Sequence, residues 1–280
     1  MVTIEEITEA QKKELRQKRL FLFDMDGTIY LDDDLFDGCL ELLDYIRQIG
    51  GRSVFVTNNS SKNVSGYVNK LRQLGITATA DDFMTSTQAT GLYLQKTHTD
   101  GKIYVLGTRD LYDTLNLEFH LPVTQKMEPS ITCLTMGFDT ELTFQKLEDA
   151  CRLLQNSDLH YIATNPDFVC PVSFGYVPDC GSIAQILYNA TKRMPKVIGK
   201  PDAPMVLLAL EKYEFSKEET LIIGDRIYTD IACGVHAGVC SLLVLSGEST
   251  MRTVAESEIK PDIILPDIQE LYNILTDVRS

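Results

Sequence analysis

The chain has 280 residues, of which 44% are hydrophobic, and a formal net charge of −14. This length and apolar content predict a substantial buried core and about two domains, and they exclude a disordered protein. The negative charge argues against binding to nucleic acid or to an anionic membrane, and any site for an anionic ligand must therefore carry local positive charge.

The seven cysteines form no C-x-x-C pair, and their number is odd. We therefore expect reduced, mostly buried thiols and a cytoplasmic location. The N-terminal segment is charged and has no apolar core of the secretory type. No stretch approaches the roughly 20 apolar residues that a membrane span needs.

Strand and helix patterns alternate in the first part of the chain. An exposed amphipathic helix is expected over 3–18, with Ile4, Ile7 and Leu15 on one side. Short apolar runs and helical periodicities then predict, in order, strand 20–24, helix 38–49, strand 53–57 and helix 62–74. Because crossovers are right-handed, this β-α-β beginning predicts a parallel sheet.

A second α/β series follows before the first pattern resumes. The series comprises helix 86–96, strand 102–106, helix 109–116, strand 131–137, helix 143–155, strand 159–163 and helix 181–193. The last part comprises helix 203–213, strand 220–225, helix 228–236, strand 240–245 and a short strand near 262–265. If the polar strand ends at 24, 57 and 225 form one site, residues 82–197 are an inserted domain, and 1–81 with 198–280 form the other.

Carboxylates follow two of these buried strands. One strand runs into Asp24-Met25-Asp26-Gly27-Thr28, and another ends in Gly224-Asp225, with Asp230 five residues on. Ligands bind beyond the carboxyl ends of such strands. Asp24, held by the strand end, is a candidate nucleophile for a phosphoryl group, and Asp26 can donate and accept the proton. A hard cation such as Mg²⁺ between Asp24 and Asp225 would offset the repulsion between carboxylate and phosphate. Asp230 either holds a metal-bound water or begins a helix.

Two further polar strings offer groups for phosphate. Thr57-Asn58-Asn59 stands before a helix, where free N–H groups bind phosphate; the alternative is an asparagine-rich turn. Lys200 is either a solvated lysine or a fixed positive charge, and its neighbours Gly199 and Pro201 favour the second interpretation.

Together these strings resemble the four motifs of the haloacid dehalogenase (HAD) superfamily. In chain order they are DMDGT at 24–28, TNNS at 57–60, GKP at 199–201 and GDRIYTD at 224–230. The insertion between the second and third motifs resembles a type-2 cap. ATNPD at 163–167 and DCGS at 179–182 are similar to the NagD-like, or 4-nitrophenyl phosphatase, branch (type IIA). The resemblance implies an α/β fold, with a Rossmann-like parallel-sheet core and an inserted α/β cap domain.

The resemblance also implies a chemistry. Asp24 would become an aspartyl-phosphate, and Asp26 would act as acid and base. Mg²⁺ would be held by Asp24, by the backbone carbonyl of Asp26 and by Asp225, with Asp230 behind these ligands. An aspartate at position 26 favours phosphoryl transfer over dehalogenation.

The resemblance also implies that different residues bind the phosphoryl group and the rest of the substrate. Thr57, Asn58 and Lys200 would hold the phosphoryl oxygens, and Asn59 is a further candidate. A closing cap would choose the substrate, with Asn165, Asp167 and the loop 168–180 as the nearest candidates. The alternative for Asn-Pro-Asp is a tight structural turn. Within the loop, the residues that either shape a specificity pocket or anchor the loop are Phe168, Phe174 and Tyr176.

These observations predict a Mg²⁺-dependent phosphatase that acts on a small phosphorylated metabolite. Sugar phosphates, nucleotides, phosphoglycolate and pyridoxal phosphate all remain open as substrates. Two alternatives also stay open: a phosphotransferase or mutase that uses the same aspartyl-phosphate, and a non-catalytic regulator that binds a phospholigand. We expect neither a nucleic-acid nor a membrane partner, and the sequence leaves homo-oligomer formation undecided.

Overall fold

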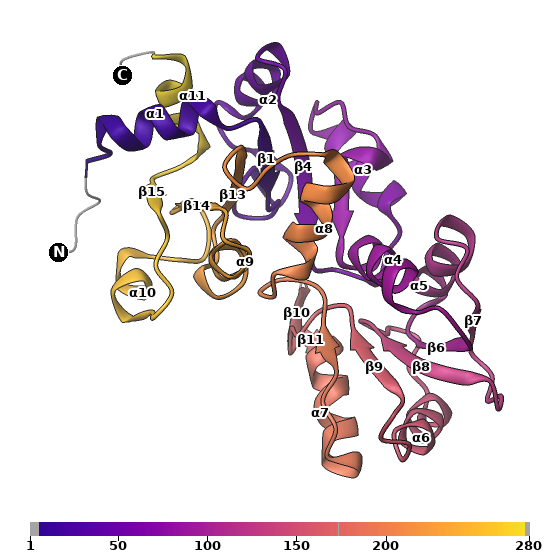
Figure 1. Ribbon diagram of the computed structural model, residues 1–280. Coiled ribbons are helices and arrows are strands. Elements are labelled where there is room, and N and C mark those ends of the chain that lie inside the picture. The colour runs from indigo at the N-terminus through magenta and orange to yellow at the C-terminus, as the bar shows by residue number, and fades with distance from the viewer. Residues whose placement is uncertain (1–5, 173, 278–280) are drawn as a thin grey trace. The chain divides into compact units, whose positions relative to one another are not determined.

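The computed structural model describes residues 6–172 and 174–277, and the chain divides into two compact units (Figure 1). The first unit is built from Met1–Thr57, Tyr67–Met84 and Pro201–Ser280, and the second from Asn58–Gly66 and Thr85–Lys200. Residues 58–66 and 198–200, which the sequence pattern assigns to the first domain, lie in the second unit, and residues 82–84, which it assigns to the inserted domain, lie in the first.

A six-stranded sheet with strand order β15-β14-β13-β1-β4-β5 forms the centre of the first unit. All the pairs from β15 to β4 are parallel, which confirms the predicted sheet type. Every residue of β1 and β13 is buried, as expected for central parallel strands covered on both faces. The strands are β1 (Leu20–Phe23), β4 (Arg52–Thr57), β5 (Phe83–Thr85), β13 (Thr220–Gly224), β14 (Cys240–Val244) and β15 (Ile263–Leu265).

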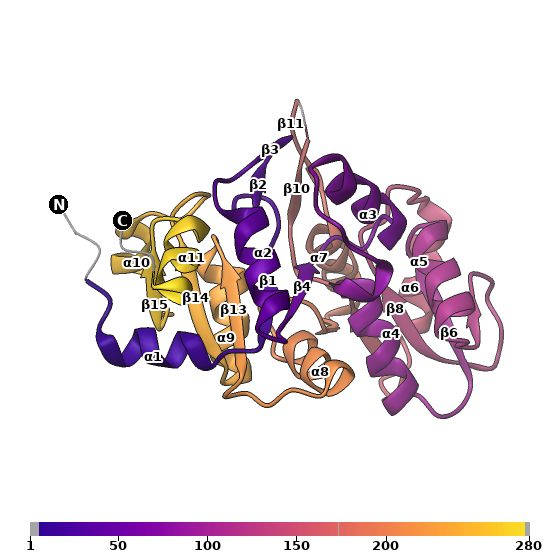
Figure 2. The ribbon, with the colours of Figure 1, turned by 90° about the horizontal axis from the view of Figure 1, so that it is seen from above.

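Helices cover this sheet, with α2 and α11 packed together on one side and α9 on the other (Figure 2). Opposite sides are expected, because the crossovers from β1 and from β13 run in opposite directions along the sheet. The helices are α1 (Glu9–Gln17), α2 (Cys39–Gln48), α3 (Val64–Gln73), α8 (Pro204–Tyr213), α9 (Ala232–Ala237), α10 (Met251–Glu256) and α11 (Ile268–Thr276).

The N-terminal helix is shorter than predicted. It begins at Glu9, because the side chain of Thr8 caps it by accepting from the N–H of Gln11. Ile4 lies outside the described residues, and Ile7 precedes the helix. The helix is otherwise mostly exposed, and Leu15, on the predicted apolar side, is fully buried.

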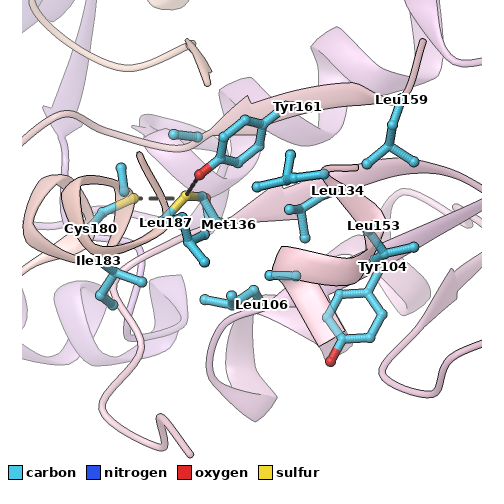
Figure 3. Packing of buried hydrophobic residues seen from close by; sticks show 14 of the residues in the cluster. Tyr104, Leu106, Leu134, Met136, Leu153, Leu159, Tyr161, Cys180, Ile183 and Leu187 are labelled. Atoms are coloured by element: carbon cyan, nitrogen blue, oxygen red, sulfur yellow. Dashed lines mark hydrogen bonds between the residues drawn. The ribbon is translucent and has the colours of Figure 1, made fainter. Parts of the chain in front are cut away.

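The second unit has its own parallel sheet, with strand order β12-β9-β8-β6-β7. Its core packs between this sheet and α6 and α7 (Figure 3). In that core the Tyr161 hydroxyl contacts the Met136 sulfur at 3.1 Å. The elements are α4 (Ser86–Thr97), β6 (Lys102–Leu106), α5 (Arg109–Asp113), β7 (Val123–Thr124), β8 (Ile131–Met136), α6 (Phe144–Leu153), β9 (His160–Ala163), α7 (Cys180–Thr191) and β12 (Lys196–Val197).

Two antiparallel hairpins were not anticipated from the sequence. β2 (Tyr30–Leu31) pairs with β3 (Asp34–Leu35), and β10 (Val169–Val172) pairs with β11 (Gly175–Pro178) within the predicted loop 168–180. β2 and β3 have two residues each, and β10 and β11 are mostly exposed, so neither hairpin gives a run long enough to show an alternating apolar pattern. Among the described residues, no helix combines the length and apolar character that crossing a bilayer requires.

Candidate active site

Three carboxylates come together in the first unit. Asp24 follows β1 and Asp225 follows β13, and these neighbouring parallel strands pair Phe23 with Ile223. The N–H of Asp24 donates to the carbonyl of Ile223 at 2.8 Å, which continues the ladder to the strand end. One carboxylate oxygen from each of Asp24, Asp225 and Asp230 lies within 4.8 Å of the other two. We call these three residues the carboxylate cluster.

The loop after β14 holds Asp225 in place. The backbone N–H of Glu248 donates to Asp225 Oδ2 at 2.7 Å. A Cβ atom at Gly247 would lie 2.1 Å from the same oxygen, and one at Gly27, whose φ is +83°, would lie 2.6 Å from it. Glycine is therefore required on both sides of this carboxylate, because any side chain would displace it.

Asp230 is held just as closely. It lies in the helical turn Ile227–Ile231, and its Oδ2 accepts from the backbone N–H of Arg226 at 3.1 Å. A Cβ at Gly224 would lie 2.3 Å from the Cβ of Asp230, so the last residue of β13 must be glycine for the turn to pack here. The sequence predicts that Asp230 lies behind the metal ligands, and in the structure one of its oxygens lies within 4.8 Å of the oxygens of Asp24 and Asp225.

The donor set of the carboxylate cluster fits a hard divalent cation. It offers three carboxylate oxygens, which suit Mg²⁺ or Ca²⁺ rather than softer metals. Asp225 and Asp230 are almost completely buried, so their mutual repulsion is poorly screened by water. A bound cation would offset that repulsion, and the glycines on either side of Asp225 leave room for the carboxylate to face it.

Asp26 lies outside the cluster, on the exposed side of the turn after β1. Its Oδ2 accepts from the Tyr30 hydroxyl at 3.4 Å, and its Oδ1 lies 3.7 Å from Lys70 Nζ. The Lys70 ammonium also lies 4.0 Å from the centre of the Tyr30 ring. Burial, followed by the charges of Asp26 and Asp24, raises the pKa of Tyr30, so its hydroxyl remains a proton donor. An exposed carboxyl with such neighbours can exchange protons with a leaving group or with water.

Asn58 and Lys200 come together in the second unit. Asn58 Oδ1 accepts from the backbone N–H of Lys200 at 2.8 Å, and Asn58 Nδ2 donates to the carbonyl of Lys200 at 2.8 Å. Asn58 Nδ2 also donates to Asp167 Oδ2 at 2.9 Å. Asn59 forms a local turn instead, in which its Oδ1 accepts from the N–H and the hydroxyl of Ser61, both at 2.9 Å. Thr57 is the last residue of β4, in the first unit.

In the Asn-Pro-Asp string Asn165 is buried, whereas Pro166 and Asp167 are half-buried. Asn165 is 1% exposed, and its Nδ2 donates to Asp167 Oδ2 at 3.0 Å and to Asp179 Oδ1 at 3.2 Å. Asp179 caps α7 by accepting from the N–H of Cys180. Burial raises the pKa of the Asp179 carboxyl to about 6, and the charge of Asp167 adds to this effect. The aromatic side chains Phe168, Phe174 and Tyr176 are exposed.

Sequence reasoning missed several of these residues. Lys70 and Tyr30 carry no local signal, since a lysine on a helix and a tyrosine after a turn are common. Gly247 lies in the loop after β14, which ends at Val244, and a glycine shortly after a buried strand was the available hint. Asp179 stands in the DCGS string, and its place before an apolar helical run is a capping signal.

Known proteins resemble the chain over nearly its whole length. A model of haloacid dehalogenase-like hydrolases matches residues 21–118, and a HAD-hydrolase-like model matches 197–271. The acid sugar phosphatase of Staphylococcus aureus (strain MRSA252) is 31% identical over 256 residues, which cover 91% of this chain and 97% of that protein.

Solved structures give the same result. The 4-nitrophenylphosphatase from Thermotoga maritima is 38% identical, with a TM-score of 0.86, over 94% of this chain and 99% of that one. The glycerol phosphate phosphatase from Mycobacterium tuberculosis, solved in complex with magnesium, is 28% identical, with a TM-score of 0.84, over 92% of this chain and 77% of that one. The chain therefore belongs to the haloacid dehalogenase-like hydrolases, in the branch that contains the 4-nitrophenylphosphatases.

Proposed function

We propose that this protein, a phosphomonoester hydrolase of the HAD family, removes phosphate from small phosphorylated metabolites through an aspartyl-phosphate on Asp24 and with the help of Mg²⁺. The observation that carries the proposal is the carboxylate cluster at the ends of two adjacent buried strands. The end of the buried strand holds Asp24 in one position, as attack on phosphorus requires. Asp26 is exposed and can reach a leaving oxygen.

The proposed reaction has two displacements. In the first, a carboxylate oxygen of Asp24 attacks phosphorus, the bond to the ester oxygen breaks, and Asp26 gives its proton to that oxygen. In the second, a water oxygen attacks phosphorus while Asp26 takes a proton from it. The bond between phosphorus and Asp24 then breaks, which releases inorganic phosphate and restores both carboxyl groups.

Asp24 and Asp225 would hold the cation, and the position of Asp230 makes it a third candidate ligand. When bound, the cation offsets the negative charge of the nucleophile and of the phosphoryl oxygens. We assign the fixed positive charge on the phosphoryl group to Lys200 and a further hydroxyl donor to Thr57. Magnesium in the mycobacterial relative supports this choice of metal.

The substrate class is proposed from chemistry and from the relatives' names. Two of the relatives are named for sugar phosphates and for glycerol phosphate. We infer that this chain also acts on a small polyhydroxylated phosphomonoester. Its net charge of −14 requires the local positive charge that the cation and Lys200 would provide.

The test uses metal-stripped protein and a panel of 4-nitrophenyl phosphate, glycerol phosphate, a hexose phosphate and a nucleoside monophosphate. We expect no turnover until Mg²⁺ is added, and then one inorganic phosphate for each alcohol released. Alcohol release that exceeds phosphate release would indicate transfer to another hydroxyl, as in a mutase. Full turnover without any divalent cation, or none with any substrate, would contradict the proposal.

A further inference from the structure

The side-chain amide of Asn58 has no N–H left for a phosphate oxygen. An asparagine amide has two N–H donors. In Asn58 one donates to Asp167 and the other to the Lys200 carbonyl, while Oδ1 accepts from the Lys200 N–H. The orientation of the amide is unambiguous, because only its oxygen can face a backbone N–H. The side chain of Asn58 therefore binds both the N–H and the carbonyl of the Lys200 backbone.

The segment that carries Lys200 is laid along the end of β9. The N–H of Ile198 donates to the carbonyl of Ala163 at 3.1 Å, and the N–H of Gly199 donates to that of Thr164 at 2.8 Å. A Cβ at Gly199 would lie 2.5 Å from the Thr164 oxygen and 2.6 Å from Asn58 Oδ1. Glycine before Lys200 is thus what allows Asn58 to reach the lysine backbone.

Asp167 fixes Asn58, and α7 fixes Asp167. One oxygen, Asp167 Oδ2, accepts from both Asn58 and Asn165. The backbone carbonyl of Asp167 accepts from the N–H of Gly181, in the first turn of α7, at 2.7 Å. The second N–H of the Asn165 amide donates to Asp179, the N-terminal cap of the same helix. The five residues Asn58, Asn165, Asp167, Asp179 and Lys200 form one connected set, which we call the Asn58 network.

We propose that Asp167 is a positioning residue, which orients Asn58 so that Asn58 holds the backbone of Lys200, and that neither Asn165 nor Asp167 contacts the substrate. The inference rests on the proposed function, in which Lys200 stabilises the phosphoryl group. It replaces the expectation that the Asn-Pro-Asp string selects the substrate. Misplacing a charge-stabilising group by about 1 Å costs on the order of 10²-fold in rate.

The first experiment is a double-mutant cycle. Asp167→Ala and Asn58→Ala are each expected to lower kcat/KM by about 10–100-fold, by the same factor for 4-nitrophenyl phosphate and for every other member of the panel. The kcat/KM of the double variant should be no more than about threefold below that of the less active single variant. The reason is that both substitutions remove the same contact, between Asn58 and the backbone of Lys200. Asp167→Asn keeps an acceptor at the position of Oδ2 and should recover most of the loss. Asp158→Ala, an exposed carboxylate of the same unit, is the matched control.

Two results would overturn the proposal. A change of more than about tenfold in the ratios of kcat/KM between substrates would make Asp167 a substrate contact. Penalties that multiply in the double variant would make the two roles independent. If Asp167→Ala does not fold, Asp167→Glu gives the same comparison, since it keeps the charge and moves the carboxylate by one methylene.

A second readout needs no activity. Hydrogen exchange of the Lys200 amide should be at least about tenfold faster in Asp167→Ala than in the wild type or in Asp158→Ala, because the amide loses its oriented acceptor. Unchanged exchange would overturn the proposal, even in an active enzyme. If the wild type hydrolyses no phosphomonoester while the exchange rate responds as expected, the proposed function fails and the positioning of Lys200 by Asp167 stands.

Discussion

The first unit gathers the carboxylates of Asp24, Asp225 and Asp230 around one point, whereas the second unit alternates the carboxylates of Asp167 and Asp179 with the amides of Asn58 and Asn165. In the carboxylate cluster three like charges converge, and a cation is the natural counterpart. Backbone N–H groups donate to carboxylate oxygens of Asp225 and Asp230, whereas in the Asn58 network the side-chain amide of Asn165 lies between the carboxylates of Asp167 and Asp179. A group of carboxylates therefore indicates a metal site only where their oxygens converge on one point.

The most severe test of the comparison removes the proposed nucleophile. Asp24→Asn keeps the shape and takes away the attacking charge, so turnover should fall by roughly 10⁴–10⁶-fold while the protein stays folded. Phosphate release and thermal unfolding measure the two effects. Near-wild-type rates would refute the covalent mechanism.

Asp26 should matter less than Asp24. Asp26→Asn is expected to lower kcat by roughly 10²–10⁴-fold, since general acid–base help is lost while the nucleophile remains. The loss should be smaller for 4-nitrophenyl phosphate, whose leaving group departs without a proton. Equal losses for aryl and alkyl phosphates would argue against the acid role.

A third variant disturbs the carboxylate cluster through its backbone. In Gly247→Ala the added Cβ would lie 2.1 Å from Asp225 Oδ2, so Asp225 must move. The Mg²⁺ concentration for half-maximal activity should rise about 10–100-fold. Gly66→Ala is the matched control, because nothing lies within 4 Å of its Cβ position in α3. An unchanged metal requirement in Gly247→Ala would show that Asp225 does not hold the cation.

The Asn58 network makes a prediction about pH. The raised pKa of Asp179, about 6 against an ordinary 3.8, means that the folded protein binds this proton more tightly than the unfolded chain. The resulting stabilisation is complete below about pH 3.8 and is lost as the pH rises through 6. Both hydrogen bonds to Asp179 end on Oδ1, so an asparagine can keep them.

Asp179→Asn should therefore gain stability relative to the wild type between pH 4 and 7, by up to about 3 kcal/mol from the shift of about two pKa units. Urea unfolding of both proteins at pH 4, 5, 6 and 7 measures the difference. Asp167 is the charged neighbour that adds to the shift, so Asp167→Asn should reduce the effect. If the difference in the free energy of unfolding between the two proteins did not vary with pH, it would contradict a raised pKa for the buried Asp179 carboxyl.

The smallest expected effect concerns the exposed hairpin of β10 and β11. Tyr176 is 70% exposed, so Tyr176→Ala should leave stability unchanged. We expect it to alter the ratios of kcat/KM across the phosphomonoester panel by up to about tenfold, as loss of one apolar contact would. Phe144→Ala, an exposed aromatic residue on α6 of the same unit, is the control. Uniform ratios would remove the hairpin from substrate selection.

The sequence by itself determined the longer strands, the parallel pairing of the first sheet and the polar residues that follow β1, β4 and β13. Buried parallel strands are continuous apolar runs, and polar residues directly after such runs must lie at one edge of a sheet; Asp24 and Asp225 are recognisable for that reason. The short hairpins carry no such periodicity. The early start expected for α1 overlooked the cap at Thr8, which fixes that helix to begin at Glu9.

The tertiary structure alone decided which hydrogen-bond partners the polar side chains have. Asn58 and Lys200 stand 142 positions apart, and Asn58 and Asp167 stand 109 apart, so no local pattern pairs them. The side-chain amides of Asn58 and Asn165 both donate to Asp167, and that of Asn58 also donates to the backbone carbonyl of Lys200. Asp230, expected behind the metal ligands, reaches the cluster because Gly224 lets its turn pack against the strand end. The identity of a side chain determines which hydrogen bonds it can make. Which of them it does make depends on the packing of segments that lie far apart in the sequence.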